Sequence, residues 1–485
     1  MSGNRVTFAL DTPGEQDSLR IRSPGNVKPT CRSWNGELQS EPLGIRWYAV
    51  MTLVFMDLIL SLAGTVCRMP GPGRGDDGLP ECIRLAPNAT HSLILDIMAV
   101  TVAVIVGFLC AKIVVDSVRS RWTKITVIIV GGGPIGLLSA LIAAKSNRVQ
   151  KIIFFEEKHK SALLNRPQQI ALDAKSVRFL KNMGVDFDNI EGCWNDNCFF
   201  TRIGVFQEYL LDIINQVYEV EWDIRLGRKF TKDSLKELDG VPGRLLAIVC
   251  DGTDGHSARW LGLSDEFMPI SCKSYGAVAA IERPEQRQVP TPEIKVHGLT
   301  FDLTAFNHDY EDEFPINGFH FKIFGSVRNR YMALSIPKCE SKMVRTLKVV
   351  LDKSIMRSIF QQCFNRYKNE SESKINDNLA LKSLKFSPRL FEIKISKRLE
   401  SAVFIEDANI FVITEGDASR CVNFHSGMDI NLGIRGLQSL HKFVRMAATA
   451  ATERSILGAL RYKSQHSNQV VQEYLKQGLR ESMYT

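Results

Sequence analysis

The chain has 485 residues, 45% of them hydrophobic, and can therefore bury a large core divided among roughly two to four structural units. Its 61 basic and 53 acidic residues give a formal charge of +8 with no block of like charge, which disfavours a nucleic-acid partner. The 11 cysteines contain no C-x-x-C pair, so the sequence predicts no zinc site or other metal site.

Two apolar runs near the N-terminus, Trp47–Val66 and Leu93–Val115, are each long enough to cross the hydrocarbon core of a bilayer. We therefore expect two transmembrane helices, over residues 46–67 and 92–116. Buried core helices are the alternative interpretation, but such helices rarely stay apolar on every face for that length.

The segments around these runs complete the expected topology. Residues 1–45 are rich in Pro, Gly and Ser and predict a disordered cytoplasmic tail. Residues 68–91 predict a lumenal or extracellular loop that carries a sequon at Asn88, and a Cys67–Cys82 disulfide is compatible with that location. Basic residues cluster after the second run, so both termini are placed in the cytoplasm and the chain is expected to be a multi-pass membrane protein.

A strand, a glycine turn and a helix follow the second apolar run. The stretch VIIVGGGPIG contains the pattern G-x-G-x-x-G, with Gly131 at the tight turn, Gly133 where the backbone approaches a pyrophosphate, and Gly136 where the helix packs close to the strand. Glu156 ends the next apolar strand, at the distance where an acid accepts hydrogen bonds from ribose hydroxyls. The complete unit predicts dinucleotide binding.

Three later stretches resemble motifs of the class A flavoprotein monooxygenases. The first is NRPQQIALDAKSVRFLKNMG (165–184), with an arginine just past the second strand. The second is VCDGTDGHSARWLGL (249–263), similar to the family's internal Asp-Gly motif, although its spacing is shorter. The third is ITEGDASRCVNFHSGMDINLGIRGL (413–437), which looks like the Gly-Asp motif followed by a helix entry.

This resemblance implies a role for each matching residue. Arg166 is expected to reach the FAD pyrophosphate, Asp254 to lie near the pyrophosphate or the nicotinamide, and Asp417, after Gly416, to bind the flavin ribityl chain. The backbone from Gly427 to Asn431 is expected near the isoalloxazine ring. Two departures affect the third motif, because Asn423-Phe424 replaces a proline-rich turn and Asp429 replaces a glycine.

A looser resemblance links RPQQIALD and IGVFQEYLL to the monooxygenase domain of the MICAL proteins. It implies that Gln207 approaches the flavin, with Arg202 as the alternative residue for that role. No MICAL accessory domain is visible in the sequence, so actin is not carried over as a substrate.

The predicted fold class is therefore α/β. A Rossmann-like FAD-binding domain is expected from residues 122–265 and 396–450, with an inserted β-rich substrate domain at 266–395. A C-terminal helix is expected at 451–485, and two N-terminal transmembrane helices precede the whole.

The implied activity is that of an FAD-dependent monooxygenase that uses NAD(P)H and oxygen on a lipophilic or membrane-associated substrate, either a small molecule or a lipid. No residue stands out as a general base. His425 lies near the expected flavin loop and could orient substrate, although a structural hydrogen bond is the simpler explanation. An FAD-dependent oxidase or dehydrogenase, or a catalytically degenerate interaction module, remain as alternatives.

Overall fold

A computed structural model describes residues 123–479, apart from 196, 239, 242, 284–298, 302–318, 338–341 and 379–382, together with most positions of 97–112. The chain divides into two compact units, one formed by residues 1–29 and 121–485 and the other by residues 30–120. In the second unit the described positions between 97 and 112 are helical.

The two expected transmembrane helices are not supported. Residues 46–67, like the expected tail at 1–45 and loop at 68–91, lie outside the described residues. Within the described part of the chain, no helix combines the length and the apolar character needed to cross a membrane. The predicted fold class is corrected on this point, and the multi-pass localisation is withdrawn with it, whereas the expected membrane partner stays a prediction.

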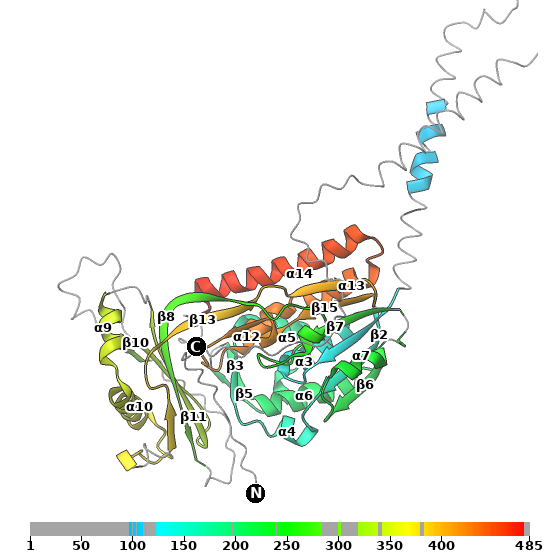
Figure 1. The fold of residues 1–485 in the computed structure, drawn as a ribbon. Helices are drawn as coiled ribbons and strands as arrows, with labels where there is room; N and C mark the ends of the chain where they lie inside the picture. Colours follow the sequence, from blue (N-terminus) through cyan, green and yellow to red (C-terminus); the bar gives the residue numbers. More distant parts are fainter. Residues whose placement is uncertain are drawn as a thin grey trace, which may run out of the picture. The chain divides into compact units, whose positions relative to one another are not determined.

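The main sheet has six strands in the order β14-β15-β7-β1-β2-β6 (Figure 1). Strand β1 (Ile125–Val130) lies in its interior, parallel to β2 (Val149–Glu156) and β7 (Arg244–Val249). Strands β6 (Glu221–Leu226) and β15 (Ile410–Thr414) extend it in parallel, and β14 (Ala402–Ile405) closes one edge in antiparallel orientation. Every residue of β1 is buried, as expected for an apolar strand covered on both faces.

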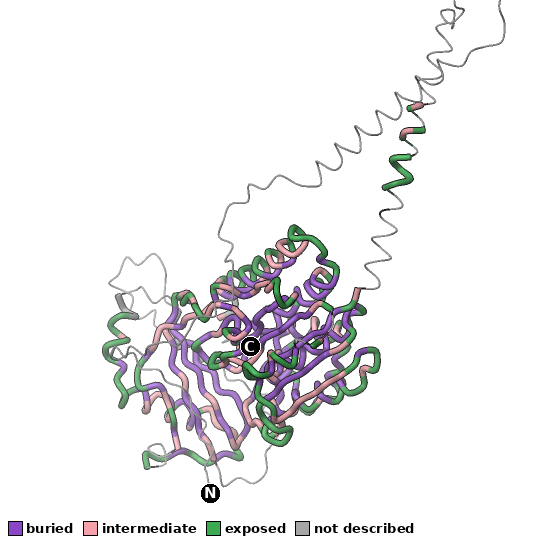
Figure 2. Tube along the Cα trace, turned by 45° about the vertical axis from the view of Figure 1, so that its right-hand side comes forward, coloured by how far each residue is buried: buried purple, intermediate pink, exposed green. Residues whose placement is uncertain are grey.

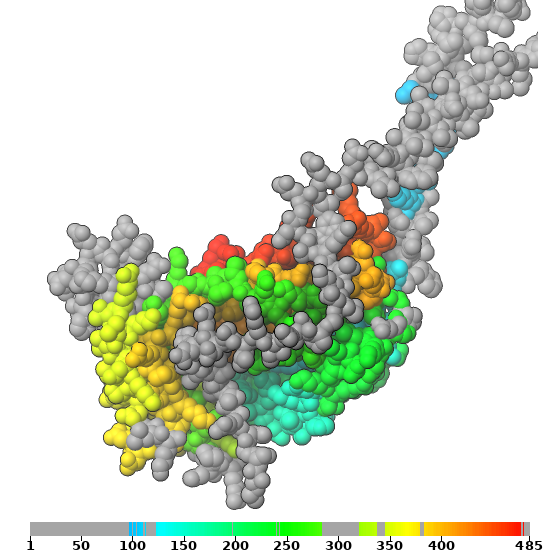
Figure 3. Space-filling view, in the orientation of Figure 1, coloured from blue at the N-terminus to red at the C-terminus, as the bar shows by residue number. Residues whose placement is uncertain are grey.

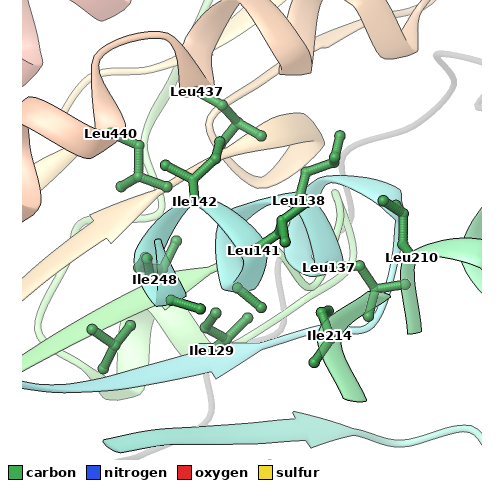
Figure 4. Close-up of a cluster of buried hydrophobic side chains, with 14 of the residues drawn as sticks. Ile129, Leu137, Leu138, Leu141, Ile142, Leu210, Ile214, Ile248, Leu437 and Leu440 are labelled. Carbon is green, nitrogen blue, oxygen red and sulfur yellow. The ribbon is translucent and has the colours of Figure 1, made fainter. Parts of the chain in front are cut away.

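Helices cover both faces of this sheet. Helix α3 (Pro134–Ala144) packs on one face with α6 (Ile203–Asn215), α12 (Ile430–Leu437) and α13 (Leu440–Thr449). Figure 4 shows Leu141 and Ile142 of α3 between the sheet and Leu437. Each such fully buried aliphatic side chain contributes about 1.5–3 kcal/mol of transfer free energy. The opposite face packs on α7 (Lys232–Leu238) and α8 (Ser257–Trp260).

A second sheet of seven strands, which we call the roof sheet, lies at the other end of this unit (Figures 1 and 3). Its strands are β16 (Arg420–Val422), β13 (Phe391–Arg398), β8 (Phe267–Glu282), β11 (Asn329–Pro337), β10 (Phe319–Gly325) and β9 (Leu299–Phe301), with β12 (Leu384–Phe386) paired to β8. One face packs on α10 (Lys353–Tyr367), which follows α9 (Lys342–Val350). The other face packs on Phe424, Leu432 and the end of α14 (Glu453–Glu473), so it faces the segment that follows Asp417.

A small sheet joins the two larger ones. It consists of β3 (Gln169–Leu172), β5 (Cys198–Arg202) and β4 (Cys193–Asn195), and it is flanked in the chain by α4 (Lys160–Leu164) and α5 (Ala174–Asn182). In Figure 2 the buried residues run along the central strands of the main and roof sheets, and exposed residues lie on the outer helices and loops. The N–H of Ala171 in β3 donates to the carbonyl oxygen of Gly427 at 2.8 Å, which ties this sheet to the expected flavin loop.

Candidate functional site

The carboxyl ends of four parallel strands meet at one edge of the main sheet. Gly131 follows the end of β1, β2 ends at Glu156, Cys250 and Asp251 follow β7, and Glu415 follows β15. The chain passes from β1 to β2 on one side and later reaches β7 on the other side of β1. In open α/β sheets, ligands bind outside the carboxyl ends at such a switch point.

The predicted strand, glycine turn and helix are confirmed. Two of their glycines are required by the packing of the fold, and the third leaves open space beside the backbone. Gly131 has φ +103°, and a Cβ at Gly136 would lie 1.8 Å from the carbonyl oxygen of Gly131, so the fold itself needs both glycines. Gly133 has φ −62°, and a Cβ there would meet no protein atom within 4 Å. The space beside Gly133, at the N-terminus of α3, therefore suits a bound group that must approach the backbone.

Glu156 and Gln207 both reach this glycine turn. Glu156 is buried, and its carboxylate accepts hydrogen bonds from the N–H of Gly132 and, at 2.8 Å, from the N–H of Lys158. Gln207 is fully buried on α6, and its Nε2 donates to the carbonyl oxygen of Gly132 at 2.8 Å. Its Oε1 has no hydrogen-bond partner among the described residues. A buried amide oxygen of this kind is usually satisfied by a ligand or water.

Arg166 connects this turn to the third motif. Burial lowers the pKa of its guanidinium, while the negative charges of Glu156 and Asp417 act in the opposite direction. Both carboxylates therefore act on the charge of Arg166, although Glu156 lies 10 positions before it and Asp417 lies 251 positions after it in the sequence. The fold thus brings the residues expected at the ribose, the pyrophosphate and the ribityl chain into one region.

Asp417 lies in the short 3-10 turn Gly416–Ala418, directly after β15 and Glu415. Its side chain is accessible to water, yet the surrounding protein raises the pKa of its carboxyl to about 6, chiefly by burial and then by the negative charge of Asp429. Arg166 and His425 oppose this shift through their positive charges. The carboxyl of Asp417 is therefore accessible from solvent, while the surrounding protein destabilises its ionised form.

The loop after Asp417 is held by hydrogen bonds to the small sheet. Asn431 donates from Nδ2 to the carbonyl oxygens of Ala171 (2.8 Å) and Met428 (2.9 Å), and it accepts from the N–H of Asp173 at 3.0 Å. Gly427 has φ +82°, and a Cβ there would lie 2.9 Å from the Phe324 ring of the roof sheet. Asn431 therefore positions the loop through protein contacts, and Gly427 permits close packing under the roof sheet.

Three other candidates from the sequence have different surroundings. Arg202 makes an ion pair with Glu191 at 3.2 Å. Asp254 is exposed, and its carboxylate lies 3.5 Å from the hydroxyl of Thr253. His425 is exposed and bonds through Nδ1 to Asp429 at 3.0 Å, which raises the pKa of its imidazole.

Sequence reasoning missed three residues at this site. Asp251 adjoins the glycine turn, because a Cβ on Gly131 would lie 2.8 Å from its backbone nitrogen. Its Oδ2 accepts from the N–H of Ser257 at 3.1 Å, and its buried Oδ1 has no hydrogen-bond partner among the described residues. Its place directly after a buried strand was the available signal. Gln169 on β3 is the second missed residue. It is only 6% exposed, and neither its side-chain oxygen nor its side-chain nitrogen has a hydrogen-bond partner among the described residues.

Lys322 is the third missed residue. Its side chain is fully buried on β10, with Nζ 5.7 Å from the centre of the Phe324 ring. Burial lowers the pKa of this lysine to about 8, and the nearby Cys198 and Asp429 act against that shift. Strand alternation groups Lys322 with Phe324 but does not show which face of the sheet covers the site, so no sequence pattern selects this lysine.

Comparison with known proteins adds little to this picture. No protein-family model matches the chain. No curated protein matches it either. Similar solved structures include p-nitrophenol 4-monooxygenase PnpA from Pseudomonas putida DLL-E4, with 11% identity, 72% of this chain and 85% of that chain covered, and a TM-score of 0.41.

Two further solved structures show a similar level of likeness. P. aeruginosa PqsL in complex with 2-aminobenzoylacetate has 14% identity, 74% and 98% coverage and a TM-score of 0.40. Tetracycline destructase Tet(51) has 16% identity, 74% and 93% coverage and a TM-score of 0.36. At this level of similarity, none of these proteins' activities transfers to the chain.

Proposed function

We propose that the chain is an FAD-dependent oxidoreductase that uses NAD(P)H and oxygen to oxygenate a small organic substrate. The observation that carries the proposal is the convergence of the open space at Gly133 with Glu156, Arg166 and Asp417 at the carboxyl edge of the main sheet. The unpartnered atoms of Gln207, Asp251 and Gln169 support it, because they leave polar capacity for a bound molecule.

Each residue has a distinct part in holding the cofactor. The N-terminus of α3 and the charge of Arg166 favour a pyrophosphate. The carboxylate of Glu156 retains acceptor capacity for a ribose hydroxyl beyond the two N–H groups it binds. Asp417 offers an acceptor for the ribityl chain. A bound FAD would supply the redox chemistry at this site.

The roof sheet would cover the place where the substrate binds. Its apolar face, which includes Phe324 and Phe424, packs over the loop of Gly427 and limits the access of water to that region. Lys322 and the His425–Asp429 pair are the titratable groups placed there, and they can hold or move a proton next to a substrate. The oxidase or dehydrogenase alternative would use the same flavin site without inserting oxygen, whereas the interaction module would bind no flavin.

The test is the absorbance spectrum of purified full-length protein after incubation with FAD and gel filtration. We expect retained flavin absorbance, bleaching when NADPH or NADH is added without oxygen, and recovery when oxygen is admitted. Gly133→Ala serves as the matched control, because it should fold but not retain flavin.

Each outcome selects one interpretation. Flavin that is reduced by substrates other than NAD(P)H, with hydrogen peroxide as the quantitative product, favours the oxidase or dehydrogenase. A folded, colourless protein that retains no FAD refutes the enzymatic proposal and leaves an interaction module.

A further inference from the structure

A surface cavity of about 570 Å³ lies away from the glycine turn, among α5, the end of α12 and the π-helical turn η5 (Tyr474–Gly478). Four of its lining side chains are cationic, and one is a carboxylate. The cations are Lys175, Arg178, Arg435 and Lys476, and the carboxylate is Glu473. The volume is typical of sites for small molecules.

The cations are contributed by three different elements. Lys175 and Arg178 lie three residues apart on α5, so their side chains share one face of that helix. Arg435 comes from α12 and is only 6% exposed, and its Nη2 donates to Asp173 at 2.7 Å. Asp173 in turn caps α5 by accepting from the N–H of Ser176 at 2.7 Å. The charge of Arg435 is therefore fixed in place at the cavity wall.

The third element that lines the cavity is the π-helical turn after α14. Lys476 lies within the π-helical turn that continues α14, and Glu473 is the last residue of α14 itself. Single π-helical turns are rare and occur frequently at functional sites. The aromatic ring of Phe179, one residue after Arg178, adds an apolar surface beside the cationic side chains.

We propose that this cavity binds the phosphate group of a small organic molecule. Guanidinium groups match the oxygens of a phosphate with paired, charge-assisted hydrogen bonds, and lysines add point charges. Phe179 then faces the organic part of the ligand. The proposal does not depend on flavin binding, because none of these residues contributes to the site at Gly133.

The experiment measures binding of inorganic pyrophosphate and of ribose 5-phosphate to the full chain by titration calorimetry, at about 0.15 M salt so that non-specific attraction is screened. A third arm measures sedimentation with phosphatidylcholine vesicles that do or do not contain phosphatidic acid. We expect saturable binding of at least one phosphate probe, weakened about tenfold or more in Arg178→Glu/Lys476→Glu.

Two controls locate the site. Lys353→Glu/Lys374→Glu makes the same change in net charge on exposed residues of the roof-sheet insertion and should leave binding unchanged. Because the glycine turn could itself take a pyrophosphate, the titration is repeated in Gly133→Ala, in which the binding that Arg178→Glu/Lys476→Glu weakens should persist. Binding to phosphatidic acid alone, lost in Arg178→Glu/Lys476→Glu, supports the site with a lipid headgroup as the source of phosphate.

Three results would overturn the proposal. They are no saturable binding of any probe, equal weakening in the two charge-reversal variants, or a loss in Gly133→Ala with retention in Arg178→Glu/Lys476→Glu, which would place the anion at the glycine turn.

Discussion

Gln207 donates a hydrogen bond from Nε2 to the carbonyl oxygen of Gly132 at 2.8 Å, across 75 positions of sequence. Because both partners are buried, Gln207→Leu leaves this carbonyl without its donor and should lower the free energy of unfolding by about 1–3 kcal/mol. It should also loosen the glycine turn, so FAD affinity measured by fluorescence quenching should fall about tenfold. Gln207→Glu cannot donate either, and equal affinity in both variants and wild type would show that the turn does not need this bond.

The glycines of the turn allow a matched pair of substitutions. Gly136→Ala places a methyl group 1.8 Å from the carbonyl oxygen of Gly131, so it should lower both the melting temperature and dinucleotide binding. Gly133→Ala meets no protein atom within 4 Å, so it should melt like wild type and still lose FAD binding. Thermal denaturation and flavin titration on both variants separate these effects. Full FAD binding by Gly133→Ala would mean that no ligand approaches this backbone.

Asp417 should give stability a specific pH dependence. Its folded pKa of about 6 lies above the ordinary carboxyl value of about 4, so the folded state favours the protonated form. This contribution to stability is complete below about pH 4 and is lost as the pH rises through 6. Asp417→Asn mimics the protonated form, so it should stabilise the apo protein more at pH 7.5 than at pH 4.5.

Urea denaturation at both pH values measures this difference for Asp417→Asn. The exposed Asp212→Asn is the control and should have the same small effect at each pH. An Asp417→Asn effect that does not vary with pH would contradict the raised pKa.

Lys322 should give the stability of the protein a pH dependence opposite to that expected from Asp417. Its folded pKa of about 8 lies below the ordinary lysine value of about 10.4. The contribution of Lys322 to the free energy of unfolding is therefore fully present above about pH 10.4 and is lost as the pH falls through 8. Lys322→Met removes a buried charge at neutral pH and should therefore stabilise the protein by on the order of 3 kcal/mol at pH 7, but by less than about 1 kcal/mol at pH 10. Guanidinium denaturation at the two pH values is the measurement, with exposed Lys374→Met as the control. Destabilisation at pH 7 would show that the fold needs the charged form.

Glu415, directly before Gly416, is fully buried with Arg420 and Lys463 of α14. Arg420 Nη2 donates to Glu415 Oε2 at 2.6 Å, and Lys463 Nζ donates to Glu415 Oε1 and, at 2.8 Å, to the hydroxyl of Ser439. Removing one charge from a buried network leaves the others uncompensated, so Lys463→Met should cost about 3–5 kcal/mol of stability. Lys236→Met, which removes one partner of an exposed ion pair, should leave the melting temperature unchanged. A cost for Lys463→Met no larger than for Lys236→Met would rule out a structural role for the network.

Local sequence patterns determined the elements whose structure depends on residues close together in the chain. The apolar strand β1, the glycine turn and helix α3 were all predicted, because period, turn chemistry and helix entry act within a few residues. Apolar length alone, in contrast, predicted two transmembrane helices, and among the described residues no helix has the length and apolar character to cross a membrane.

Only the tertiary structure decided which polar groups share a site. Arg166 lies near Glu156 and Asp417 because parallel pairing aligns the ends of β1, β2, β7 and β15. Lys322 lies beside Phe324, whose ring packs against Gly427, and Asp251 adjoins Gly131 because β7 pairs with β1. Strand order and register are set by the packing of the whole core, so no local stretch of sequence contains them.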